Sequence, residues 1–115
     1  MKRAERKLRK SDCKWWGYVK ACIADYPRTL KEAETPPESW TGQRRREYDG
    51  VRMAIEETKK LPDGERRVSI IRLSLWGNQY TLQGAAVQNY VSVKTAQRWR
   101  NAFIILTARH MGLLD

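Results

Sequence analysis

Apolar residues recur at helical spacing along most of this chain. Within five segments they return every three or four residues, which places them on one face of an α-helix. The longest stripes are Trp15, Val19, Cys22 and Tyr26 within residues 11–26; Tyr48, Val51, Ile55 and Thr58 within 44–61; Val68, Ile71 and Leu75 within 65–76; and Ala96, Trp99, Phe103 and Leu106 in the last helix. The pattern predicts an all-α fold, a small helical domain.

Breaks in the pattern divide the chain into three regions. The sequence predicts a basic N-terminal arm over residues 1–10 and an N-terminal helical region over residues 11–60. Its first helix, 11–26, is expected to start at a capping Ser11 or Asp12 and to stop at Pro27. Three prolines and a glycine without sustained periodicity predict a loop over residues 27–43. The turn Leu61-Pro62-Asp63-Gly64 opens the third region, residues 61–115, and Gly77-Asn78 is expected to close its first helix.

Residues 81–100 predict two short helices joined by a tight turn. Thr81 and Ser92 are residue types that cap helix N-termini, because their hydroxyl oxygens accept a hydrogen bond from an unpaired backbone N–H. Ala85 and Ala86 are small enough for the second helix to cross closely. Asn89 or Tyr90 is expected to make the turn, and Val91 to fill the space between the helices. This arrangement is typical of a helix-turn-helix.

The net charge of +10 is unevenly distributed. Residues 1–10 carry +5, residues 11–60 carry +1 and residues 61–115 carry +4. A polyanion, nucleic acid above all, is the expected partner, and a solubilising charge excess is the alternative. The run Arg44-Arg45-Arg46 is a further candidate phosphate site, because cations at a helix N-terminus oppose the helix dipole unless an anion compensates them.

The second helix of the pair carries its polar residues at its start. The candidates for recognising bases in a major groove lie off the buried stripe and are Lys94, Thr95, Gln97, Arg98 and Asn101. Arg and Lys match guanine O6 and N7, and Gln matches adenine N6 and N7. Arg66, Arg67 and Arg100 are candidates for phosphate contacts, which add affinity that falls with salt. The alternative is a helical hairpin with a solvated basic face.

Other classes of protein find little support in the sequence. The longest apolar run, residues 102–106, is far shorter than a membrane span, and no signal peptide is evident at the N-terminus. Cys13 and Cys22 match no zinc or redox motif, which favours a reducing cytosolic compartment. The single histidine, His110, lacks a neighbouring ligand or nucleophile. We therefore expect no enzyme activity, no cofactor and no metal site.

The C-terminal half resembles the fourth region of bacterial sigma factors. Residues 61–68, LPDGERRV, are similar to the entry into that region, and TLQGAAVQNYVSVKTAQRW is similar to its helix-turn-helix. The resemblance implies that Ser92 starts the recognition helix, that Lys94 and Arg98 contact promoter bases, and that Thr95 and Gln97 face DNA beside them. Thr81 and Ser92 belong to the same expected interface. Asn89-Tyr90 departs from the usual Leu-Gly turn, and Lys94 stands where sigma factors often carry an acid, so a different base sequence is implied.

The chain from about residue 15 onward also resembles the small phage late transcription regulators of the RinA and ArpU type. The similarity rests on YVKACIADYP, TAQRWRNAFI and the closing MGLLD. It implies a sequence-specific activator of phage packaging, morphogenesis or lysis genes in the cytoplasm of a Gram-positive host. Double-stranded DNA is the implied partner. The N-terminal helices are expected to pack the core, form a homodimer or contact host RNA polymerase.

Two alternatives stay open from the sequence. A small terminase-type packaging protein also binds phage DNA through a helix-turn-helix, although that unit usually lies near the N-terminus and the protein forms large rings. A protein with a sigma-like surface could instead bind RNA polymerase and not bind DNA. Ring formation would mark the first alternative, and loss of salt-dependent DNA affinity would mark the second.

Overall fold

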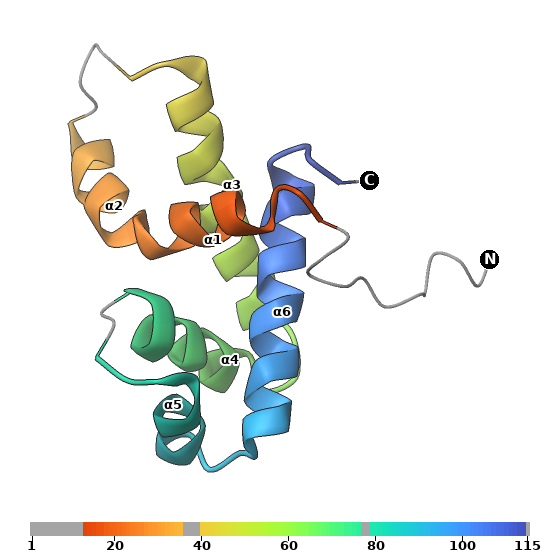
Figure 1. The fold of residues 1–115 in the computed structure, drawn as a ribbon. Coiled ribbons are helices and arrows are strands. Elements are labelled where there is room, and N and C mark those ends of the chain that lie inside the picture. Colours follow the sequence, from red (N-terminus) through yellow and green to blue (C-terminus); the bar gives the residue numbers. More distant parts are fainter. Residues whose placement is uncertain (1–12, 36–39, 77–78, 115) are drawn as a thin grey trace.

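The computed structural model describes residues 13–35, 40–76 and 79–114, which form an all-helical fold (Figure 1). This confirms the predicted all-α class. The elements are α1 (Trp16–Ala24), α2 (Tyr26–Glu34), α3 (Gly42–Lys59), α4 (Gly64–Ile71) with a π-helical turn (Arg72–Trp76), α5 (Leu82–Gln88) and α6 (Val93–His110).

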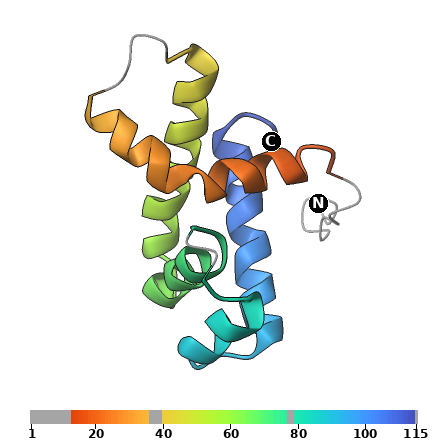
Figure 2. The same ribbon diagram turned by 60° about the vertical axis from the view of Figure 1, so that its left-hand side comes forward.

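The two longest helices, α3 and α6, pack against each other and form the centre of the molecule. Helix α1 crosses both of them, and α2 continues from α1 along α3 (Figure 2). Helices α4 and α5 lie beside the N-terminal half of α6, at the end of the molecule away from α2 (Figure 1). The predicted helix-turn-helix therefore occupies one end of the fold.

Two clusters of buried side chains hold these helices together, and α6 contributes to both. The larger cluster joins α1, α3, α4 and the C-terminal half of α6, where Phe103, Ile104 and Ala108 are buried. The smaller cluster joins α4, α5 and the N-terminal half of α6 through Ile70, Ala85, Ala86, Ala96 and Trp99. The apolar C-terminal half of α6 is thus covered by other helices of the same chain.

The N-terminal region differs from its prediction in one respect. Instead of one helix stopped by Pro27, α1 ends at Ala24 and a second helix, α2, begins at Tyr26 with Pro27 in its first turn. Proline is tolerated there because the first N–H groups of a helix have no partner within it. The loop predicted over residues 27–43 is therefore wrong for most of its length. The proposed caps Ser11 and Asp12, the basic arm, Pro36-Pro37 and Gly77-Asn78 lie outside the described residues.

The third predicted helix, residues 65–76, is continuous but changes its winding. After α4 the chain makes a π-helical turn, and the buried Ser74 hydroxyl donates to the Ile70 carbonyl at 2.6 Å. The change directs Leu73 toward the smaller cluster, while Leu75 and Trp76 pack against the larger one. This segment therefore connects the helix-turn-helix end to the rest of the molecule.

Candidate nucleic-acid interface

Both helices of the predicted pair begin at the caps that the sequence indicates. The Thr81 hydroxyl oxygen accepts a hydrogen bond from the Gly84 N–H at 3.0 Å. The Ser92 oxygen accepts one from the Thr95 N–H at 3.0 Å, and its own O–H donates to the Thr95 hydroxyl. These bonds satisfy backbone donors that a helix leaves unpaired at its first turn. Thr81 and Ser92 thus stabilise the starts of α5 and α6, independently of any contact with a partner.

The turn between α5 and α6 uses Asn89 and Tyr90 for different purposes. Asn89 is buried, and its side-chain amide donates to the Ala85 carbonyl at 3.0 Å, which closes the end of α5. Tyr90 adopts a left-handed backbone with φ of 58°, while its side chain is 90% exposed. Val91 then packs partly buried between the helices, as predicted. Tyr90 therefore adopts a backbone conformation that glycine reaches without steric cost.

Small side chains set the distance between the two helices. Ala85, Ala86 and Ala96 are fully buried where α5 meets α6, with Trp99 beneath them. A methyl side chain lets backbones approach closely, so larger residues here would force the helices apart. The packing fixes the orientation of the start of α6.

The outward face of α6 carries exposed polar and basic residues. Lys94, Gln97 and Arg98 are exposed, and Thr95 and Asn101 are half-buried. Residues 94, 97, 98 and 101 lie at helical spacing on one face. Within the described residues, Lys94, Gln97 and Arg98 make no side-chain hydrogen bond or ion pair. Their donors are available to a partner.

The three arginines assigned to phosphates lie in different surroundings. Arg66 bridges two segments, because it donates to the Asn89 carbonyl at 3.1 Å and to the Asp63 carboxylate at 2.7 Å. Arg67 lies over the Trp99 ring at 5.1 Å and donates to the Pro62 carbonyl. Both side chains therefore support the helix pair from α4.

Arg100 lies at the margin of the outward face of α6. Its side chain is half-buried, and its Nε has no hydrogen-bond partner among the described residues. Burial lowers the pKa of this guanidinium, since the charged form loses solvation. A nearby anion would compensate the charge of this guanidinium.

The part of the sequence after Glu65 is one-sided in charge. Between Glu65 and Asp115 the sequence contains no acidic residue, but it contains seven basic ones: Arg66, Arg67, Arg72, Lys94, Arg98, Arg100 and Arg109. The excess of positive charge raises the local concentration of anions and speeds their association.

Sequence reasoning missed three apolar side chains at the same end. Val87 on α5 is 64% exposed, Tyr90 in the turn is 90% exposed, and Val93 at the start of α6 is 41% exposed. Only Val93 could have been anticipated, since it follows the capping Ser92 directly and so lies in the first turn of the expected recognition helix. The exposure of Val87 and Tyr90 is evident only from the three-dimensional structure.

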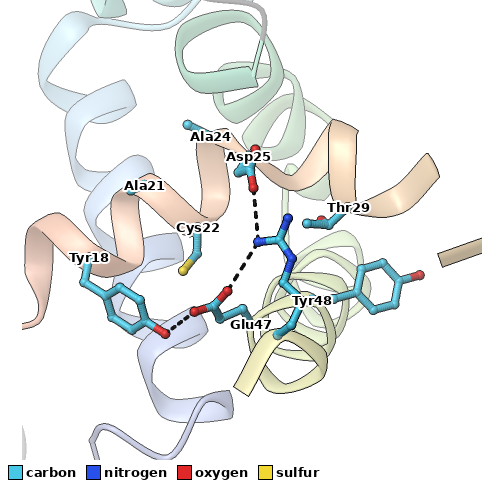
Figure 3. Close-up of a pocket in the computed structure, with 9 residues that line it drawn as sticks. Tyr18, Ala21, Cys22, Ala24, Asp25, Thr29, Glu47 and Tyr48 are labelled. Atoms are coloured by element: carbon cyan, nitrogen blue, oxygen red, sulfur yellow. Dashed lines mark hydrogen bonds and ion pairs between the residues drawn. The ribbon is translucent and has the colours of Figure 1, made fainter. Parts of the chain in front are cut away.

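A separate pocket lies between α1, α2 and α3, with a volume of about 480 Å³ (Figure 3). Arg44 lies in its wall and pairs with Asp25 at 3.3 Å, Glu47 at 3.5 Å and Glu32 at 3.6 Å. The Tyr18 hydroxyl donates to Glu47. The polar groups of this pocket are thus occupied by one another.

The pairing of Arg44 also bears on the predicted phosphate site at residues 44–46. Arg44 is held by carboxylates, and Arg45 lies 5.7 Å from the Trp40 ring centroid, so only Arg46 is exposed without a contact to a described residue. Three arginines do not converge on a common anion here. The Thr41 cap and the neighbouring acids stabilise this helix start instead.

Other kinds of site find no support in the described ranges. Across residues 13–35, 40–76 and 79–114, no three His, Cys, Asp or Glu side chains gather as metal ligands. Over the same ranges, no helix has the length and apolar character to cross a membrane. His110 contacts Glu57 at 2.8 Å, on the far half of α6 from the outward basic face.

Comparison of the chain with protein-family models, with curated proteins and with solved structures found no match. What the fold defines is a small all-helical protein with a capped helix pair at one end. The function therefore has to be argued from that end of the molecule.

Proposed function

We propose that this chain is a sequence-specific DNA-binding transcription regulator that places the start of α6 in the major groove. The observation that carries the proposal is the exposed face of α6, where Lys94, Gln97 and Arg98 have no hydrogen bond or ion pair with any residue that the structure describes. They lie in a segment of the sequence without acidic residues. A major groove about 12 Å wide accommodates an α-helix, and its base edges offer acceptors to such donors.

Each candidate residue has a role in this proposal. Lys94, Gln97 and Arg98 contact base edges, with Thr95 and Asn101 beside them. Arg100 is half-buried and is the candidate for a phosphate contact at this end of the molecule. Thr81 and Ser92 hold the helix starts. Arg66 and Arg67 act through the turn and Trp99, and their remaining exposed atoms can add phosphate contacts.

The resemblance to phage late regulators supports a more specific proposal. The chain would activate packaging, morphogenesis or lysis genes in the cytoplasm of a bacterial host. Double-stranded promoter DNA would be its partner, and the N-terminal helices would supply a surface for RNA polymerase or for a second copy of the chain.

Replacement of Lys94 and Arg98 by alanine tests the DNA interface. We expect the purified full chain to protect a discrete site in fragments of its own genome, and each variant to bind that site about 5- to 150-fold more weakly, since one bidentate base contact contributes about 1–3 kcal/mol. Footprinting locates the site, and fluorescence anisotropy measures the affinity across a salt series.

Lys31→Ala is the matched control, because Lys31 is an exposed cation on α2, away from the helix pair. It should bind as the unaltered chain does. Unchanged binding by Lys94→Ala and Arg98→Ala would sink the proposed interface. Absence of any salt-dependent DNA affinity would favour a protein-binding role, and a large ring in light scattering would favour a packaging protein.

A further inference from the structure

Val93 is the first residue of α6 and is 41% exposed, directly after the capping Ser92. Valine is a weaker helix former than alanine, because its branched Cβ restricts the side chain in a helix. Here it also leaves much of its apolar surface in water. Packing within the chain therefore covers only part of this side chain.

The neighbours of Val93 indicate what could cover it. Lys94 follows it, and Gln97 lies one helical turn further on the same side, both exposed. Val87 and Tyr90 add exposed apolar surface around the same turn. This apolar surface lies inside a segment with seven cations and no acid, so its partner carries negative charge.

Duplex DNA offers one apolar group in the major groove, the C5-methyl of thymine. We propose that Val93 packs against a thymine methyl and so makes a thymine part of the preferred site, beside the base that Lys94 contacts. This inference rests on the proposed function. It adds a specificity determinant that forms no hydrogen bond.

Thymine-to-deoxyuridine substitution provides the test, because it removes the methyl and leaves every hydrogen-bonding group unchanged. Each thymine of the footprinted site is replaced in turn in synthetic duplexes. We expect one or two positions to lose about three- to fivefold in affinity, the change expected when one methyl group loses an apolar contact. Anisotropy at fixed salt measures it with the full chain.

The Val93→Ala variant links the loss to this side chain. We expect it to bind the thymine site three- to fivefold more weakly than the unaltered chain and to show almost no further loss with deoxyuridine. Leu30→Ala is the matched control, since it shortens an exposed apolar side chain on α2, away from the helix pair, and should keep the full deoxyuridine effect. Circular dichroism confirms that both variants remain helical.

The outcomes separate this inference from the function on which it rests. Specific binding that no deoxyuridine substitution weakens would overturn the role of Val93 and leave the DNA interface intact. An equal deoxyuridine loss in Val93→Ala would do the same, because another residue would then contact the methyl. Failure of the unaltered chain to select any site would overturn both.

Discussion

Tyr90 carries the clearest conflict between local preference and position. Its backbone has φ of 58°, a region that costs an L-residue with a Cβ about 1–2 kcal/mol. Its side chain is 90% exposed, so burial offsets little of that cost within the chain. The neighbours of Tyr90 impose this turn geometry. Asn89 closes α5 directly before Tyr90, and Ser92 starts α6 two residues after Tyr90.

We therefore expect Tyr90→Gly to raise the free energy of unfolding by up to about 1 kcal/mol, since glycine adopts this conformation without steric cost. Urea denaturation followed by circular dichroism measures the change. Ala102→Gly, at an exposed position in the middle of α6, is the control and should lower the free energy of unfolding by about 0.5–1 kcal/mol. A loss of stability in Tyr90→Gly would show that the tyrosine ring contributes more than its exposure indicates.

At the scale of elements, the contact between α3 and the end of α6 depends on a glycine. Gly50 is buried on α3, and a Cβ placed there would lie 2.4 Å from Met111 Cγ, just beyond α6. Gly17 on α1 is different, because a Cβ there would have no neighbour within 4 Å. A substitution at Gly50 therefore tests a packing constraint, whereas a substitution at Gly17 tests helix propensity alone.

Alanine at these two positions should act in opposite directions. Gly50→Ala should lower the free energy of unfolding by about 1–3 kcal/mol, the usual cost of overpacking. Gly17→Ala should raise it by up to about 1 kcal/mol, because alanine favours the helix. Thermal and urea unfolding measure both variants. If Gly50→Ala is as stable as the unaltered chain, Met111 has moved aside and the contact is not a constraint.

The same scale shows what the sequence could determine. The pair α5 and α6 was predictable, because caps, periodicity and small crossing residues are local signals. The division between α1 and α2 was not, since Pro27 can end one helix or begin another. Tyr26, the first residue of α2, is buried against the rings of Tyr48 and Trp76, which are distant in sequence. The contacts of Arg66 and Arg67 with Asn89 and Trp99 are equally non-local.

At the scale of the whole molecule, we expect the free energy of unfolding to decrease as the pH rises in the alkaline range. Burial raises the pKa of Cys22 to about 11 and those of Tyr18 and Tyr26 to about 12. The unfolded chain releases these protons at lower pH than the folded chain does. Stability from these groups is therefore present in full below about pH 9 and is lost as pH rises toward 12.

We expect the midpoint of thermal unfolding to fall between pH 9 and pH 12, and to fall less steeply in Tyr26→Phe, which removes one of the buried hydroxyls. Circular dichroism at 222 nm across a pH series measures it. Tyr90→Phe removes an exposed hydroxyl and should leave the pH dependence as it was. An identical slope in Tyr26→Phe and the unaltered chain would contradict this account.

Helix α6 is one continuous helix of 18 residues, about 27 Å long, that belongs to both buried clusters. Its inward residues are fixed by packing, whereas Lys94, Gln97 and Arg98 make no hydrogen bond or ion pair within the described part of the chain. Substitutions at these exposed positions can therefore accumulate one at a time while the fold persists. The exposed face and the buried face are free to evolve at different speeds along a single helix.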